Sequence, residues 1–121
     1  MSVAVAACWA LLAAIHLIPA VALFRPAMIQ TLYGVDPAAP SFVLLHHRAA
    51  LFAVVVVICV AALFDPSVRR LASVAVFISM ATFVMLWWNA GQPAALRTIA
   101  IADMVGLAPL AVVAWQAWRA A

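Results

Sequence analysis

Ionisable side chains lie inside stretches of this chain that are otherwise apolar enough to cross a membrane. A charged side chain at the centre of a bilayer costs roughly 2.5–3.5 kcal/mol even on the most lenient insertion scales. Each such residue therefore needs a partner, a cavity or a function. The residues concerned are His16, His47, Arg48 and Asp103, with His46 and Arg97 close by.

The composition is that of an integral membrane protein. Hydrophobic residues make up 72% of the 121 residues and charged residues 7%, whereas a soluble domain is about half apolar and about a quarter charged. The net charge of +3 comes from six arginines scattered along the chain. They form no cluster typical of a nucleic-acid interface.

Four apolar runs cover residues 3–24, 41–64, 71–89 and 94–119. A membrane-spanning helix needs about 20 such residues, and in lipid the backbone must satisfy its own hydrogen bonds. Alternation with period two is absent, which argues against a barrel. No basic residue precedes the first run, so we expect a mature span and not a signal peptide. We predict one all-α domain, a bundle of four transmembrane helices.

The connection between the first two runs is long enough to hold structure. Pro26 suits the start of a helix and Gly34 its end. Between them, Ile29, Leu32 and Tyr33 form an apolar stripe. We predict a short interfacial helix here, with Tyr33 at the level of the lipid headgroups.

Four spans place both chain termini at one end of the bundle, which we call the termini end, and residues 25–40 and 90–93 at the other, the loop end. Arg69, Arg70 and Arg119 fall at the termini end, against Arg25 and Arg97 at the loop end. The positive-inside rule then predicts cytoplasmic termini in a bacterial inner membrane. Tryptophans are expected to mark both interfaces, with Trp115 and Trp118 at the termini end and Trp87 and Trp88 at the loop end.

Helix rise places the ionisable residues in one layer of the loop-end half. At 1.5 Å per residue, His16 lies about 12 Å deep, His47 and Arg48 about 9–10 Å, and Asp103 about 14 Å. We therefore predict a pocket that opens toward the loop end. The third run adds polar residues at helical spacing, namely Ser79, Thr82 and Asn89.

A purely structural reading of these residues stays open. Asp103 with Arg48 or Arg97 would form an ion pair that fixes helix register. His16 would bond a carbonyl group left free by Pro19.

The adjacent residues His46, His47 and Arg48 point about 100° apart around a helix, so they do not all face one pocket. His46 and Arg48 lie nearly opposite each other. We expect one of them to face a neighbouring subunit or the headgroups, which suggests a homo-oligomer.

The chemistry of these residues suggests a binding or catalytic site. A neutral imidazole beside a carboxylate is a general acid–base pair or a ligand for a metal or haem, and a buried arginine binds carboxylate, phosphate or enolate. No nucleophile or phosphate-loop motif is present, and the histidine spacing specifies no metal site. The candidate catalytic residues are His16, His47, Arg48 and Asp103, and the candidate ligand-binding residues are His46, Asn89, Arg97, Thr82 and Ser79.

The two cysteines, Cys8 and Cys59, form no CxxC pair and no zinc spacing. We expect reduced, inert thiols packed as small apolar residues. Their similar depth leaves a disulfide or a soft-metal pair as the alternative.

The chain resembles the small bacterial four-helix membrane proteins around the DoxX-like families. The resemblance rests on the LYGV stretch at residues 32–35, the HHRAALFA stretch that opens the second run, proline-bounded turns, and an arginine-containing fourth run with a mid-span aspartate. Some of those proteins are membrane subunits of quinone-linked oxidoreductases.

Two functions follow as expectations. The first is a pocket that binds a lipophilic small molecule or a cofactor such as haem or a quinone, with isomerase, hydratase or redox chemistry as its catalytic form. The second is a non-catalytic subunit that anchors a larger membrane complex.

Overall fold

The structure is a computed structural model that describes residues 1–120, and within that range it is built of helices without a strand. This confirms the all-α prediction. Five α-helices and two short 3-10 helices follow one another along the chain: α1 (Val3–Val21), α2 (Ala27–Tyr33), α3 (Ser41–Phe64), η1 (Pro66–Val68), α4 (Arg69–Asn89), η2 (Ala94–Leu96) and α5 (Arg97–Arg119).

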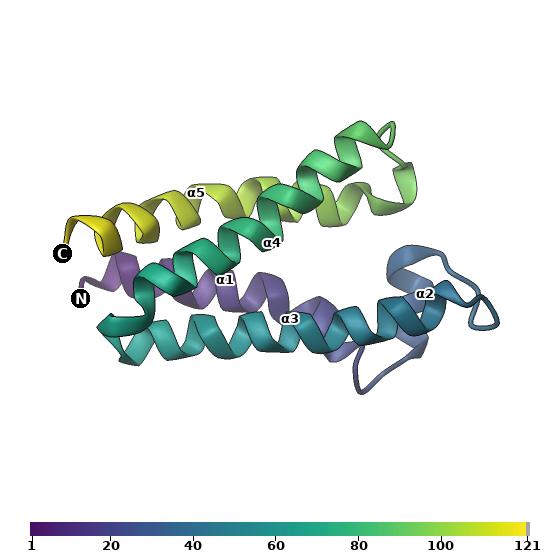
Figure 1. The fold of residues 1–121 in the computed structure, drawn as a ribbon, viewed down its shortest axis with the longest axis horizontal. Coiled ribbons are helices and arrows are strands. Elements are labelled where there is room, and N and C mark those ends of the chain that lie inside the picture. The colour runs from purple at the N-terminus through teal and green to yellow at the C-terminus, as the bar shows by residue number, and fades with distance from the viewer. Residues whose placement is uncertain (121) are drawn as a thin grey trace.

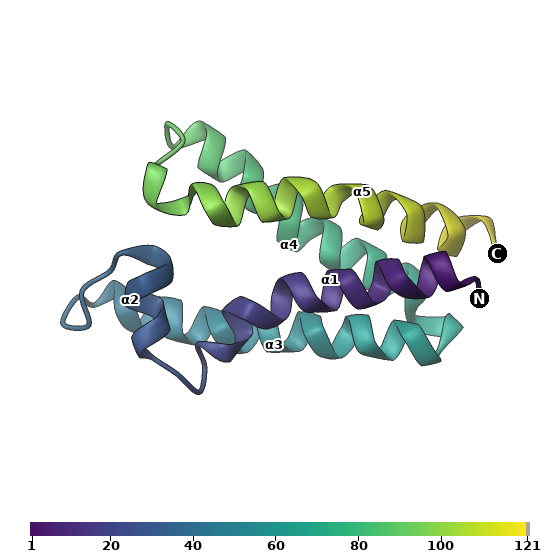
Figure 2. The ribbon, with the colours of Figure 1, turned by 180° about the vertical axis from the view of Figure 1, so that it is seen from behind.

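The four long helices form an up-and-down bundle with both termini at the same end (Figures 1 and 2). Helix α1 packs against α3 and α5, and α4 packs against α5. Helices α3 and α4 are joined by a tight turn at the termini end and separate toward the loop end, as Figure 1 shows. The bundle is therefore closed at one end and spread at the other.

All four long helices are long and apolar enough to cross a membrane. Large apolar side chains point outward along their length, among them Val43, Leu44 and Val57 of α3 and Leu71 of α4. In a soluble protein so much exposed apolar surface would be a liability, whereas in lipid it is the favourable exterior. The chain is a multi-pass helical membrane protein.

The core lies in the middle and the termini-end half of the bundle. Trp9, Leu12, Val76 and Val113 are fully buried there. Gly106 of α5 lets the neighbouring helices approach closely, because a Cβ atom at this position would overlap the side chain of Met80.

Local sequence explains where the helices begin and end. Ser2 caps α1, because its Oγ accepts a hydrogen bond from Val5 N at 3.2 Å. Helix α1 ends at Val21, three residues before the predicted end, because the chain tightens into a turn after Pro19. The Asp65 carboxylate accepts a hydrogen bond from Ser67 N at 2.8 Å and so starts η1.

The predicted short helix between the first two spans is present as α2. The helix begins at Ala27, one residue later than expected, with Pro26 as its N-cap residue. Gly34 ends it in the left-handed conformation at φ 66°. Ile29 and Tyr33 are buried against Ala22, directly after α1, and Ala49 in the first half of α3. Helix α2 also contacts η2, so it bridges the two halves of the bundle at the loop end.

Candidate functional site

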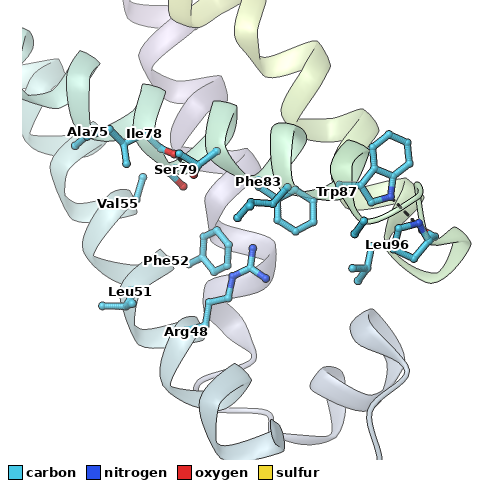
Figure 3. Close-up of a pocket in the computed structure, with 14 residues that line it drawn as sticks. Arg48, Leu51, Phe52, Val55, Ala75, Ile78, Ser79, Phe83, Trp87 and Leu96 are labelled. Atoms are coloured by element: carbon cyan, nitrogen blue, oxygen red, sulfur yellow. Dashed lines mark hydrogen bonds between the residues drawn. The ribbon is translucent and has the colours of Figure 1, made fainter.

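A pocket of about 600 Å³ lies between α3 and α4 in the loop-end half of the bundle (Figure 3). Arg48 and Phe52 of α3 line one side, and Ser79, Phe83 and Trp87 of α4 line the other. Pockets that hold small molecules have volumes of about 300–1,000 Å³. The space is therefore large enough for a ligand.

The divergence of α3 and α4 creates this pocket. Apolar side chains at its rim are exposed on the outer surface of the spans: Leu51 is 54% exposed, Ile78 56% and Leu86 62%. Leu96 of η2 lines the loop-end side, and α2 packs against η2 there. The mouth consequently opens sideways, on the surface that faces lipid.

Arg48 projects into this pocket, where its guanidinium group lies among aromatic rings (Figure 3). Its Cζ atom is 4.9 Å from the ring centroid of Phe52, 5.0 Å from that of Phe83 and 5.6 Å from that of Tyr33. Such cation–π contacts contribute about 0.5–2 kcal/mol each. Among residues 1–120, no group accepts a hydrogen bond from Arg48 and no carboxylate oxygen lies within 4.0 Å of its nitrogens.

His16 lies behind the pocket wall, with its ring centroid 5.8 Å from that of Phe52. Its Nδ1 is 2.8 Å from Leu12 O, and its Nε2 is 3.2 Å from Ser79 Oγ. A carbonyl oxygen only accepts, so Nδ1 carries the proton, and in the neutral imidazole Nε2 accepts from the Ser79 hydroxyl. His16 is therefore linked to the pocket by its hydrogen bond with Ser79. It does not bond the Ile15 carbonyl, which is the one that Pro19 frees.

Asp103 faces the interior of the bundle from α5, as predicted, and is 7% exposed. It forms no ion pair with an arginine or histidine among residues 1–120. Arg48 and Asp103 both act on the Tyr33 hydroxyl: burial raises the pKa of Tyr33, the positive charge of Arg48 opposes this increase, and the Asp103 carboxylate adds to it. Arg48, Asp103 and Tyr33 thus form one electrostatic group from three helices.

The other two residues of the histidine–arginine triplet do not enter the pocket. His46 Nε2 donates to Leu23 O at 2.9 Å and so ties α3 to the turn after α1. His47 is exposed on the outer surface. The expectation that His46 or Arg48 points outward is wrong. The Arg48 side chain is long enough to turn into the pocket, and the His46 ring lies close enough to Leu23 O to bond it. His47 is the residue that points outward.

The remaining predicted ligand-binding residues divide between the pocket and the surface. Ser79 and Thr82 line the pocket, and the Thr82 hydroxyl donates to Ile78 O one turn earlier. Asn89 is exposed at the end of α4 and lines a separate shallow groove. Arg97 is exposed at the start of α5.

Sequence reasoning missed the aromatic residues of the site. Phe52 follows Arg48 by four residues, a helical spacing that would have identified this pair. Tyr33 was expected at the headgroups, yet its side chain is buried against Arg48. Trp87 was expected to belt the interface, but it turns inward and donates from Nε1 to Pro93 O at 3.1 Å. Phe83 follows Ser79 by four residues, so the same spacing would have placed it on the polar face of the third span.

The donor set of the site favours an anion or a polarised carbonyl group. Within residues 1–120, no three histidine, cysteine, aspartate or glutamate side chains lie close enough together to hold a metal ion. Cys8 and Cys59 are both free thiols. The guanidinium of Arg48 offers hydrogen-bond donors to a negative group, and the imidazole of His16 offers a proton acceptor through Ser79.

Comparisons with known proteins do not extend this description: no protein-family model matches the chain, and no curated protein and no solved structure shows significant similarity to it.

Proposed function

We propose that this protein binds a lipophilic small molecule that carries an anionic or strongly polar head group, in the pocket between α3 and α4. The head group pairs with Arg48, and the apolar part lies along Leu51, Val55 and Ile78. The ligand enters sideways from the bilayer, through the mouth between the two helices.

The observation that carries this proposal is the state of Arg48. Its guanidinium is held by three aromatic rings, yet no carboxylate or carbonyl group among residues 1–120 accepts a hydrogen bond from it. An arginine inside a membrane span pairs most favourably with acceptors of fixed geometry, such as a bidentate carboxylate or phosphate. Asp103 is too far away for such a pair, so the acceptor comes from the ligand.

Oleate and its methyl ester test this proposal directly, because they share the apolar chain and differ in charge. Both ligands are titrated into purified protein in detergent and followed by native mass spectrometry. Wild-type protein is expected to prefer oleate. Arg48→Met is expected to weaken oleate binding by about ten-fold or more, since a hydrogen bond to a charged group contributes roughly 1.5–3 kcal/mol.

Arg97→Met is the matched control, because it removes the same charge at the same end of the bundle from an exposed position. It is expected to leave oleate binding unchanged. The proposal fails if Arg48→Met retains wild-type affinity, or if both variants weaken binding equally. Thermal unfolding of each variant establishes that it is folded before binding is interpreted.

A catalytic form of this function is favoured by the hydrogen bond between His16 and Ser79. In it, His16 acts as general base through the Ser79 hydroxyl on the bound molecule, and Arg48 stabilises the negative charge that develops. This corresponds to isomerase or hydratase chemistry. His16→Gln is then expected to bind the molecule that co-purifies with wild type but to accumulate one chemical form of it. An unchanged composition of the co-purified material argues for simple binding.

The orientation belongs to the same proposal. Arg69, Arg70 and Arg119 at the termini end support cytoplasmic termini in a bacterial inner membrane, with the pocket in the outer half of the bilayer. Membrane-impermeant labelling of Ser67→Cys and Asp36→Cys in intact cells tests this. Only position 36 is expected to react from outside, and reaction at position 67 would invert the topology.

A further inference from the structure

A second cavity, at the opposite end of the bundle from the Arg48 pocket, lies between the start of α4 and the end of α5. It has a volume of about 310 Å³ and is polar for a membrane protein. Arg69 and Arg70 of α4, Ser67 of η1 and Gln116 of α5 line it. The ligand pocket proposed above contains none of these residues.

The two arginines keep hydrogen-bond donors free after binding the bundle. Arg69 donates from Nε to Ala62 O at 2.8 Å and from Nη2 to Leu63 O at 3.5 Å. Arg70 donates from Nε to Ala117 O at 3.3 Å. Arg69 Nη1 and both terminal nitrogens of Arg70 make no hydrogen bond among residues 1–120. They give the cavity a positive charge with unused donors.

Gln116 does not add a ligand contact to this cavity. Its side-chain oxygen has no hydrogen-bond partner but is also inaccessible to solvent, so a group bound in the cavity does not reach it. The cavity therefore offers the arginine donors to an anion.

A separate apolar groove of about 480 Å³ lies along the same two helices and shares no lining residue with the cavity. Phe77 of α4 and Ala111 and Ala114 of α5 line it, together with Trp118. Arg70 lines the polar cavity and Trp118 lines the groove, and the Arg70 guanidinium lies 5.3 Å from the ring centroid of Trp118, so the two spaces are neighbours. A charged site at the membrane boundary that leads to an apolar groove inside the span matches an amphiphile with a phosphate head.

We infer that this cavity and groove bind an anionic phospholipid, with its phosphodiester on Arg69 and Arg70 and one acyl chain along Phe77 and Ala111. Basic pockets between transmembrane helices are suited to such headgroups. The Asp65 carboxylate forms no ion pair with Arg69 or Arg70, because none of its oxygens lies within 4.0 Å of their nitrogens.

The test uses the full chain in nanodiscs that contain phosphatidylcholine with a minor fraction of phosphatidylglycerol, and counts retained lipids by native mass spectrometry after mild extraction. Wild type is expected to retain phosphatidylglycerol selectively. Ala120→Glu adds a negative charge beside the cavity without removing any hydrogen bond of Arg69 or Arg70. It should lower that retention about five-fold, the effect of one charge near the surface.

Ala95→Glu is the matched control, since it introduces the same charge at an exposed position of the loop end, and it is expected to leave retention unchanged. Ala111→Phe fills the groove and should lower the retention of phosphatidylglycerol. Added inorganic phosphate is expected to leave the lipid retention of every variant unchanged. Equal retention of phosphatidylglycerol and phosphatidylcholine by wild type would overturn the inference. So would displacement by inorganic phosphate alone, which would assign the cavity to a free anion. Because Arg48 is intact in every variant, oleate binding at the first pocket distinguishes failure of this inference from failure of the proposed function.

Discussion

The two ends of the bundle use arginine in opposite ways. At the termini end, Arg69 and Arg70 of α4 donate to carbonyl groups in the last turns of α3 and α5. The last carbonyl groups of a helix lack partners within the helix, and a positive charge is favourable there. These two side chains therefore hold three helices together.

At the loop end, Arg48 has no helix end to satisfy. It lies within α3, where the backbone carbonyl groups are already bonded inside the helix. At this end of the bundle, α4 diverges from α3. Aromatic rings surround it in place of acceptors. The comparison teaches that the position of an arginine relative to helix ends decides whether it closes the bundle or remains available to a ligand.

The largest expected effect separates these two roles by stability. Arg69 is 8% exposed, and Arg69→Met strands the carbonyl groups of Ala62 and Leu63. We expect the free energy of unfolding to fall by about 1.5–3 kcal/mol, the contribution of hydrogen bonds to a charged group. Arg48→Met breaks no hydrogen bond; it loses the cation–π contacts, but removal of a charge from the span offsets part of that loss, so the decrease in stability should be smaller. Reversible denaturation in mixed micelles measures both, and equal losses would remove the distinction between the two ends.

A smaller effect is expected for the turn that holds the open end in shape. Trp87 donates from Nε1 to Pro93 O across the turn between α4 and η2. Trp87→Phe keeps most of the apolar volume but loses this bond, at a cost of about 0.5–1.5 kcal/mol. Trp88→Phe is the control, because Trp88 is 63% exposed and makes no such bond. Similar unfolding midpoints for the two variants would show that the turn does not depend on the Trp87 bond.

The helices could be predicted from the sequence, because apolar runs of about 20 residues leave the backbone no alternative in lipid. The depth of His16, Arg48 and Asp103 followed from helix rise alone. The side-chain directions did not. His47 turned out to face outward and Trp87 inward, because helix rotation and the divergence of α3 from α4 depend on packing across the bundle, which the local pattern does not contain.

The partner of Asp103 shows the same limit. The sequence left a structural ion pair with Arg48 or Arg97 open, and the structure has no direct pair with either. Arg97 sits on the surface because η2 takes up the first residues of the fourth span. The role of Tyr33 was also out of reach, since nothing in the sequence specifies that α2 folds back against α3.

Tyr33 gives a direct measure of the electrostatics at the open end, because it is the one tyrosine of the chain. Burial raises the pKa of its hydroxyl above the ordinary value of 10.0, against the effect of Arg48 and with that of Asp103. Arg48→Met should raise the pKa further, and Asp103→Asn should lower it. Absorbance of the tyrosinate form during an alkaline titration reads this residue alone. Shifts in the same direction for both variants would contradict the grouping of these three residues.

The smallest effect concerns Asp65 at the closed end. Hydrogen bonds from the Ser67 side chain and backbone hold the pKa of this carboxyl below its ordinary value of 3.8, and the nearby charge of Arg69 acts in the same direction. A lowered pKa in the folded state means that the ionised form stabilises the fold above the unfolded-state pKa, and that this contribution is lost as the pH falls through about 4 and below. Asp65→Asn should therefore be less stable than wild type at neutral pH and approach it under acid conditions.

Unfolding measured across this range tests the prediction, with Asp36→Asn as the control at the loop end. If wild type and Asp65→Asn keep a constant difference down to strongly acid pH, the cap at Asp65 stabilises the closed end independently of its charge, which would contradict this prediction.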